Sequence, residues 1–195
     1  MKTTRLEAFS DGVIAILITI MVLELKTPAG EDWTALRSIG AHFCPYVLSF
    51  VMLGIYWNNH HHMIHMTDRV TGGILWANLH LLFWLSLIPF GTAWIGESGL
   101  APLPTAIYAA ILMLAGTAYY ILKTAIIRSQ GPSSRLQAAL GSDTKGIVSV
   151  LMYLVAIPLA FVSPWIAAAI FVAVAFIWLV PDRRIEGRLN EHGRA

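Results

Sequence analysis

The sequence has 195 residues, of which 57% are hydrophobic and 12% are charged, with a net charge of +2. Soluble domains carry about 25% charged residues, so this chain cannot cover its surface with polar side chains. We therefore predict an all-α integral membrane protein. The small net charge gives no indication of a nucleic-acid partner, and the single cysteine, Cys44, excludes an intramolecular disulfide.

Six apolar stretches meet or approach the length of about 20 residues that a helix needs to cross a bilayer. They predict a single transmembrane domain over residues 1–195, with the last two spans joined by a tight turn at Ser163-Pro164. The expected spans are residues 6–25, 36–57, 73–95, 104–126, 147–162 and 165–180.

The positions of the basic residues predict the orientation, because cytoplasmic loops are enriched in Lys and Arg. If the N-terminus is cytoplasmic, 11 of the 13 Lys and Arg residues lie on the cytoplasmic side, and only Lys26 and Arg37 lie outside. Five spans would place the two ends on opposite sides and spoil this division. We therefore expect six spans with both termini in the cytoplasm.

Polar residues gather near the cytoplasmic side of the first three expected spans. Asp11 lies inside the first span next to Ser10, although an ionisable residue in a membrane helix costs about 2.5–3.5 kcal/mol. Asn78 in the third span lies at about the same depth, and Trp57 and His60 lie where the second span ends. We expect a hydrogen-bonded cluster joining the three helices, whose simplest role is packing without a ligand.

A histidine-rich segment follows the second span, with His60, His61, His62 and His65 close together. Imidazole nitrogens bind zinc and copper, but adjacent residues of a helix point in different directions. Only His61 and His65 are spaced to share a face. A polar, partly solvated helix end is the preferred interpretation, and no metal and no cofactor are expected.

Catalytic motifs are absent from the sequence. There is no phosphate-binding glycine loop, no His-Glu-x-x-His motif and no serine or cysteine at the spacing of a nucleophile motif. The chain is therefore not expected to be an enzyme.

The first span continues beyond Asp11 with a helical stripe. Ile16, Ile20 and Leu23 are spaced i, i+4, i+7 and therefore lie on one face, with Thr19 at its border. On composition alone, such a stripe faces lipid or packs against a neighbouring helix.

The motif Arg5-x-x-x-Phe9-Ser10-Asp11, which opens the first apolar helix, resembles the transmembrane protein 175 family. These are endolysosomal potassium channels with smaller prokaryotic relatives. Trp57-x-x-His60 and the segment from Leu85 to Phe90 are also similar to the family. The resemblance covers about residues 5–95, and the remainder of the chain agrees in layout.

The resemblance implies a potassium-selective cation channel in a prokaryotic plasma membrane. Its partners would be membrane lipid, permeant potassium and further copies of itself in a homotetramer around a central pore lined by the first helix. The pore stripe of the family corresponds to Ile16, Ile20 and Leu23, with Ile16 at the main constriction and Thr19 implicated in selectivity. The motif residues Arg5, Phe9, Ser10 and Asp11 would be structural, with Trp57, His60 and Asn78 as their partners.

The physical account of such a channel is a hydrophobic gate, because a narrow ring of isoleucine side chains closes a pore by dewetting. The main alternative is a small secondary transporter of cations or metal ions, which would need a binding site within the membrane. A structural membrane protein that assembles with a partner is the second alternative.

Overall fold

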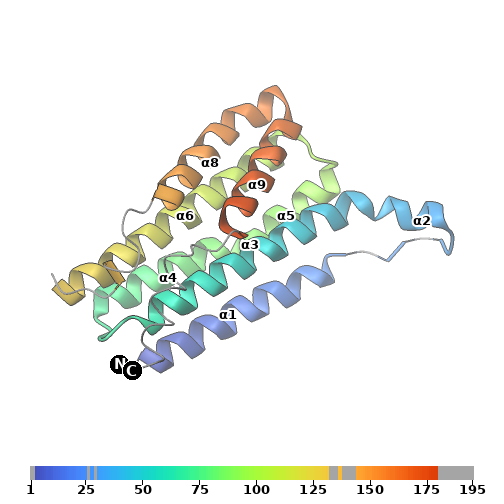
Figure 1. Cartoon of the computed structure of the whole chain (residues 1–195). Coiled ribbons are helices and arrows are strands. Elements are labelled where there is room, and N and C mark those ends of the chain that lie inside the picture. The colour runs from blue at the N-terminus through green and yellow to red at the C-terminus, as the bar shows by residue number, and fades with distance from the viewer. Residues whose placement is uncertain (1–2, 26, 29, 132–135, 138–143, 180–195) are drawn as a thin grey trace.

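The computed structural model describes residues 3–25, 27–28, 30–131, 136–137 and 144–179, and these residues contain helices and no strand. The helices pack side by side in a bundle, from which α2 projects at one end (Figure 1). The helix bounds are α1 Thr3–Leu23, α2 Trp33–Ser38, α3 Gly40–His65, α4 Gly72–Ser86, α5 Ile88–Ser98, α6 Pro102–Gln130, α8 Thr144–Val162 and α9 Pro164–Leu179.

Five of the described helical segments are long and apolar enough to cross a membrane. They are α1, α3, the α4–α5 unit from Gly72 to Ser98, α6 and α8, whereas α9 is apolar but only 16 residues long. The chain is therefore a multi-pass membrane protein. The described residues contain five of the six expected spans at full length, and α9 is the shorter sixth segment. The expected end of the last span, Val180, lies outside the described residues.

The helix boundaries differ from the expected spans at two places with a physical cause. α3 continues past Trp57 to His65, so the histidines form the polar end of this helix, beyond the expected apolar span. The third span is interrupted at Leu87, where α4 ends and α5 begins with Pro89 in its first turn. Proline has no backbone N–H to donate to the preceding turn, which explains the break.

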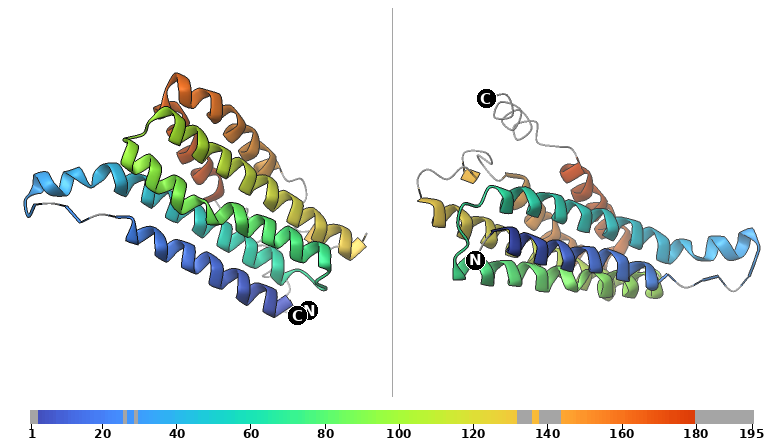
Figure 2. Two further views of the ribbon diagram at one scale, coloured as in Figure 1. Left: turned by 180° about the vertical axis from the view of Figure 1, so that it is seen from behind. Right: turned by 90° about the horizontal axis from the view of Figure 1, so that it is seen from below.

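α1 lies along one edge of the bundle and contacts α3, α4 and α5 (Figure 2). α6 contacts α4, α5, α8 and α9 from the opposite side, and 12 of its residues are buried. Gly91 and Gly116 permit this close packing. A Cβ at Gly91 would lie 2.8 Å from Tyr108 Cδ2, and one at Gly116 would lie 3.0 Å from Val150 Cγ2.

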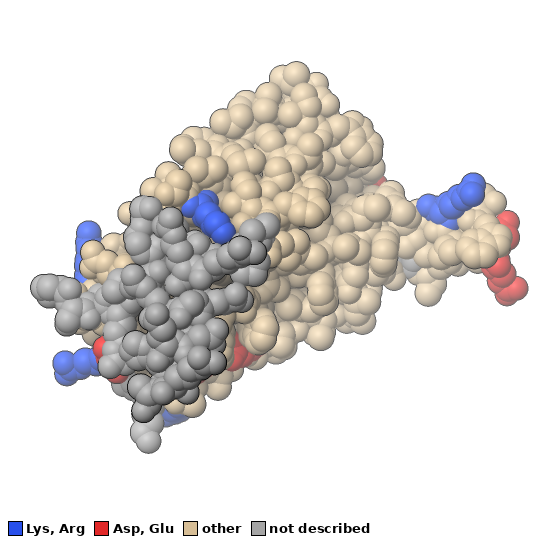
Figure 3. Space-filling view, in the orientation of Figure 1, with Lys and Arg blue, Asp and Glu red and all other residues tan. Residues whose placement is uncertain are grey.

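The outer surface is largely apolar. On the face shown in Figure 3, charged side chains lie mainly toward the two ends of the molecule, and the surface between them carries few. Large exposed hydrophobic side chains include Trp76, Phe176 and Trp165, which are 75%, 64% and 75% exposed. Apolar surface of this extent has to be covered by lipid or by another protein chain.

Part of the expected charge distribution cannot be placed. Lys2, Lys26, Arg135 and the four arginines after residue 180 lie outside the described residues. The cytoplasmic position of both termini therefore stays a prediction from the sequence.

Candidate functional site

α1 has two distinct faces. One face is buried against the bundle through residues spaced three or four apart, namely Leu6, Ser10, Ile14, Leu17 and Met21. The opposite side of the helix is exposed along its whole length. The helix therefore contributes one face to the packing of this chain and leaves another for something outside it.

A fully buried polar chain connects the packed face of α1 to α3 and α4. His60 Nε2 lies 2.7 Å from Asn78 Oδ1, and Asn78 Nδ2 donates to Ser10 Oγ at 2.9 Å. Ser10 Oγ in turn donates to the carbonyl of Leu6 at 2.9 Å. Because each donor is matched to one acceptor, the chain has a single direction, which places the His60 proton on Nε2. His60 Nδ1 has no hydrogen-bond partner among the described residues.

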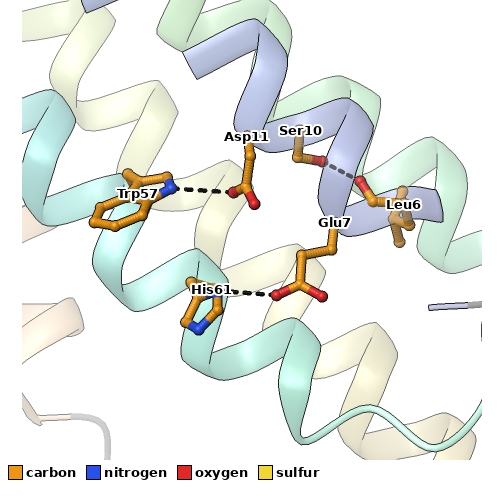
Figure 4. Close-up of polar contacts among 6 residues, drawn as sticks. All are labelled: Leu6, Glu7, Ser10, Asp11, Trp57 and His61. Atoms are coloured by element: carbon orange, nitrogen blue, oxygen red, sulfur yellow. Dashed lines mark hydrogen bonds and ion pairs between the residues drawn. The ribbon is translucent and has the colours of Figure 1, made fainter. Parts of the chain in front are cut away.

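Two further contacts join α1 to α3 beside this buried chain (Figure 4). Trp57 Nε1 donates to Asp11 Oδ1 at 3.1 Å, and His61 Nδ1 lies 2.9 Å from Glu7 Oε1. Glu7 and Asp11 are four residues apart on α1, and Trp57 and His61 are four residues apart on α3. Because the two helices run in opposite directions, the Asp11–Trp57 and Glu7–His61 contacts lie one helical turn apart. Both contacts fix the same register between α1 and α3.

Sequence reasoning placed Ser10, Asp11, Trp57, His60 and Asn78 in one layer, and the structure brings these five side chains together through the contacts above. Two other expected members lie elsewhere. Phe9 is 53% exposed and Arg5 is exposed, and neither side chain takes part in these contacts among the described residues. Their structural role stays a prediction.

A second buried polar cluster was not predicted. Thr92 Oγ1 on α5 lies 2.6 Å from Ser49 Oγ on α3, and Ser49 Oγ lies 2.7 Å from the hydroxyl of Tyr108 on α6. Thr92 also donates to the carbonyl of Ile88 at 2.7 Å. Isolated hydroxyl residues carry little signal in a sequence, because each can bond to its own helix backbone.

The predicted pore residues lie on the exposed side of α1. Ile16, Ile20 and Leu23 are 56%, 41% and 79% exposed. Thr19 is also exposed, and its hydroxyl donates to the carbonyl of Ile16 at 2.9 Å. The stripe therefore lies on the surface of the chain, away from the face of α1 that packs against the bundle.

Comparisons with known proteins identify the relatives of this fold. A potassium channel of Chryseobacterium sp. (strain P1-3) is 51% identical over 192 residues, which span 98% of this chain and 100% of the relative. The family described as endosomal/lysosomal potassium channel TMEM175 matches residues 5–89. The chain belongs to the TMEM175 family. The resemblance drawn from Arg5-x-x-x-Phe9-Ser10-Asp11 is thereby confirmed.

Other TMEM175-family relatives extend the match over most of the chain. A potassium channel of Streptomyces collinus is 31% identical over 173 residues, covering 83% of this chain and 84% of the relative. The crystal structure of a lysosomal potassium-selective channel TMEM175 homolog from Chamaesiphon minutus superimposes with a TM-score of 0.76 at 26% identity. It covers 91% of this chain and 96% of the homolog, so the similarity extends to the helices that follow the matched segment 5–89.

Proposed function

We propose that this TMEM175-family protein is a potassium-selective channel in which copies of the chain form a homotetramer around a pore lined by α1. The observation that carries the proposal is the division of α1 into two faces. The buried face is tied to α3 and α4 by hydrogen bonds, whereas the exposed face carries the apolar stripe of Ile16, Ile20 and Leu23. A helix held from behind in this way can present the stripe to a symmetry axis.

The stripe supports a hydrophobic gate. One chain supplies only one such face, so several copies are needed to enclose a path for an ion. A ring of Ile16 side chains would exclude water when it is narrow, and a modest outward movement of α1 would hydrate it. Ile20 and Leu23 continue the apolar lining toward the outer end.

Thr19 has the chemistry of a selectivity residue. Its hydroxyl donates its proton to the Ile16 carbonyl, and a hydroxyl oxygen keeps acceptor lone pairs after it has donated. A ring of such oxygens could replace part of the hydration shell of a cation. The same bond holds the Thr19 side chain against the helix, so its oxygen has a defined position.

The relatives support potassium as the permeant ion, since the proteins from Chryseobacterium and Streptomyces are named potassium channels. The bacterial sources of these relatives and the predicted charge asymmetry support a bacterial plasma membrane, with both termini cytoplasmic. The apolar outer surface is consistent with lipid around the assembly.

The proposal is tested by reconstituting the purified protein in planar bilayers with potassium on one side and sodium on the other. We expect single-channel steps and a reversal potential displaced toward that of potassium. A protein that exchanges cations in a saturable manner without single-channel steps would be a transporter instead. If no potassium passes at any voltage or lipid composition tested, the channel proposal fails.

A further inference from the structure

Two carboxylates and one histidine lie together between α1 and α3, at the contacts of Trp57 with Asp11 and of His61 with Glu7. Glu7, Asp11 and His61 each offer one oxygen or nitrogen atom, and these atoms all lie within 4.8 Å of one another. All three side chains are partly buried, with His61 43% and Glu7 20% exposed. Figure 4 shows the two carboxylates of α1 directed toward α3, where His61 points back at them.

The charge of this group is unbalanced. Glu7 and Asp11 are two carboxylates on successive turns, and like charges at i, i+4 repel. One Asp11 oxygen accepts from the neutral indole of Trp57, and one Glu7 oxygen contacts His61. Carboxylates accept several hydrogen bonds each, so both residues keep free lone pairs. A cation between the two helices would relieve the repulsion.

The donor set suits a first-row divalent cation. One imidazole nitrogen and two carboxylate oxygens are typical zinc ligands, and three protein ligands with a water in the fourth position are a common arrangement. Magnesium prefers oxygen ligands in octahedral geometry and keeps most of its water, so it fits this group less well.

Neighbouring rings hold His61 in position. Its ring lies between Trp57 and His65, one turn away on either side, with ring centroids 6.2 Å apart in both cases. The His65 ring is nearly parallel to it, at an interplanar angle of 15°. Contacts that fix the orientation of a ligand side chain raise its affinity for a metal.

We propose that Glu7, Asp11 and His61 form a binding site for a zinc-like divalent cation, which clamps the pore helix α1 to α3. His61 would coordinate through Nδ1. In the neutral ring, the proton that lies between Nδ1 and Glu7 passes to solvent and Nε2 takes one from solvent, so the ring changes tautomer and keeps one proton. The clamp ties α1 to α3, so α1 can no longer tilt or slide against α3 when the gate widens, and the potassium current is therefore lowered. This last step rests on the proposed channel function, whereas ion binding does not.

Binding is tested first, by titrating tag-free purified protein with zinc chloride in a calorimeter. We expect one ion per chain with a Kd in the micromolar range, little affected by an excess of magnesium. Glu7→Gln and His61→Gln each preserve size and remove a ligand, and each should weaken binding by about tenfold or more. His80→Gln is the matched control, because His80 is an exposed histidine on α4 that accepts a hydrogen bond from Trp84 and takes no part in the contacts of His61 described above. It should bind zinc as the wild type does. Size-exclusion profiles show whether each variant remains assembled.

Equal binding by wild type, Glu7→Gln and His61→Gln would overturn the site, as would an equal loss in His80→Gln. The current is then recorded in planar bilayers with zinc added to each side in turn. We expect a severalfold reduction from the side that carries the N-terminus, and no reduction in His61→Gln. Zinc binding with an unchanged current would overturn the clamp. Zinc binding by a protein that passes no potassium would instead overturn the channel proposal and leave the site in place.

Discussion

Asn78 on α4 donates a hydrogen bond to Ser10 on α1 at 2.9 Å, and both side chains are completely buried. The bond connects the proposed pore helix to a helix that lies 68 residues further along the chain. Its position between Ser10 and His60 means that replacing one side chain leaves two polar partners without their contacts. Five predictions follow from this and from the other contacts of the bundle.

Asn78→Ala should destabilise the protein by about 1–3 kcal/mol, because buried polar groups on Ser10 and His60 lose their partner. Asn58→Ala is the matched control, since Asn58 is exposed on α3. The measurement is thermal unfolding in detergent, followed by tryptophan fluorescence. Equal melting temperatures for the two variants would show that the buried chain contributes nothing to stability.

Asp11→Ala should reduce assembly more than permeation. The change removes the acceptor of the 3.1 Å bond from Trp57, and polar contacts between membrane helices contribute about 0.6–2 kcal/mol each. The yield of assembled protein by size-exclusion chromatography is the measurement, and Trp57→Phe should produce a similar loss. A fully assembled Asp11→Ala protein with altered ion selectivity would place Asp11 in the permeation path.

Ile16→Asn should raise the single-channel conductance or the open probability severalfold, because a polar ring stays hydrated at a width that dewets an isoleucine ring. Val22→Asn is the control, since Val22 is also exposed on α1 but lies outside the Ile16–Ile20–Leu23 stripe. Bilayer recordings of both variants are the measurement. An unchanged current in Ile16→Asn would remove Ile16 from the gate.

Thr19→Val should bring the permeability of potassium and sodium closer together, because it replaces the hydroxyl oxygen by a methyl group of similar size. Thr124→Val on α6 removes an exposed hydroxyl with a similar bond to its own helix and should leave selectivity as it is. Reversal potentials under bi-ionic conditions report the ratio. Retained selectivity in Thr19→Val would assign ion discrimination to other residues.

Gly91→Ala should destabilise the bundle by about 1–3 kcal/mol through overpacking, because the new Cβ would lie 2.8 Å from Tyr108 Cδ2. Gly54→Ala meets nothing within 4 Å and should be neutral or slightly stabilising, since alanine favours a helix over glycine by about 1 kcal/mol. Thermal unfolding compares the two. A melting temperature of Gly91→Ala at or above that of Gly54→Ala would show that Tyr108 yields without cost.

The features that could be predicted from the sequence are those that depend on hydrophobic composition and on how deep a residue lies in the membrane. Apolar runs located the helices, and the shared depth of Ser10, Asp11 and Asn78 pointed to the layer where α1, α3 and α4 meet. The pairing of Glu7 with His61 could not be predicted, because it depends on the register between two antiparallel helices. His61 lies in the part of α3 beyond Trp57, outside the expected apolar span, so hydropathy gave no depth for it.

The break at Leu87 had a visible cause in Pro89, but prolines inside membrane helices are often tolerated, so its position alone did not decide between a kink and an interruption. The cluster of Ser49, Thr92 and Tyr108 had no such signal. Its hydroxyls come from three helices, and only the packing of α3, α5 and α6 brings them within bonding distance.

The contacts of α1 have a consequence for how the protein is made. α1 is synthesised first, but Asp11 meets Trp57 only 46 residues later and Ser10 meets Asn78 only 68 residues later. When the first helix emerges, the carboxylate of Asp11 thus has no protein partner yet. The nascent first helix has to rest at the interface, or beside the insertion machinery, until α3 and α4 arrive. The polar contacts of α1 can therefore form only after α3 and α4 have been synthesised and inserted.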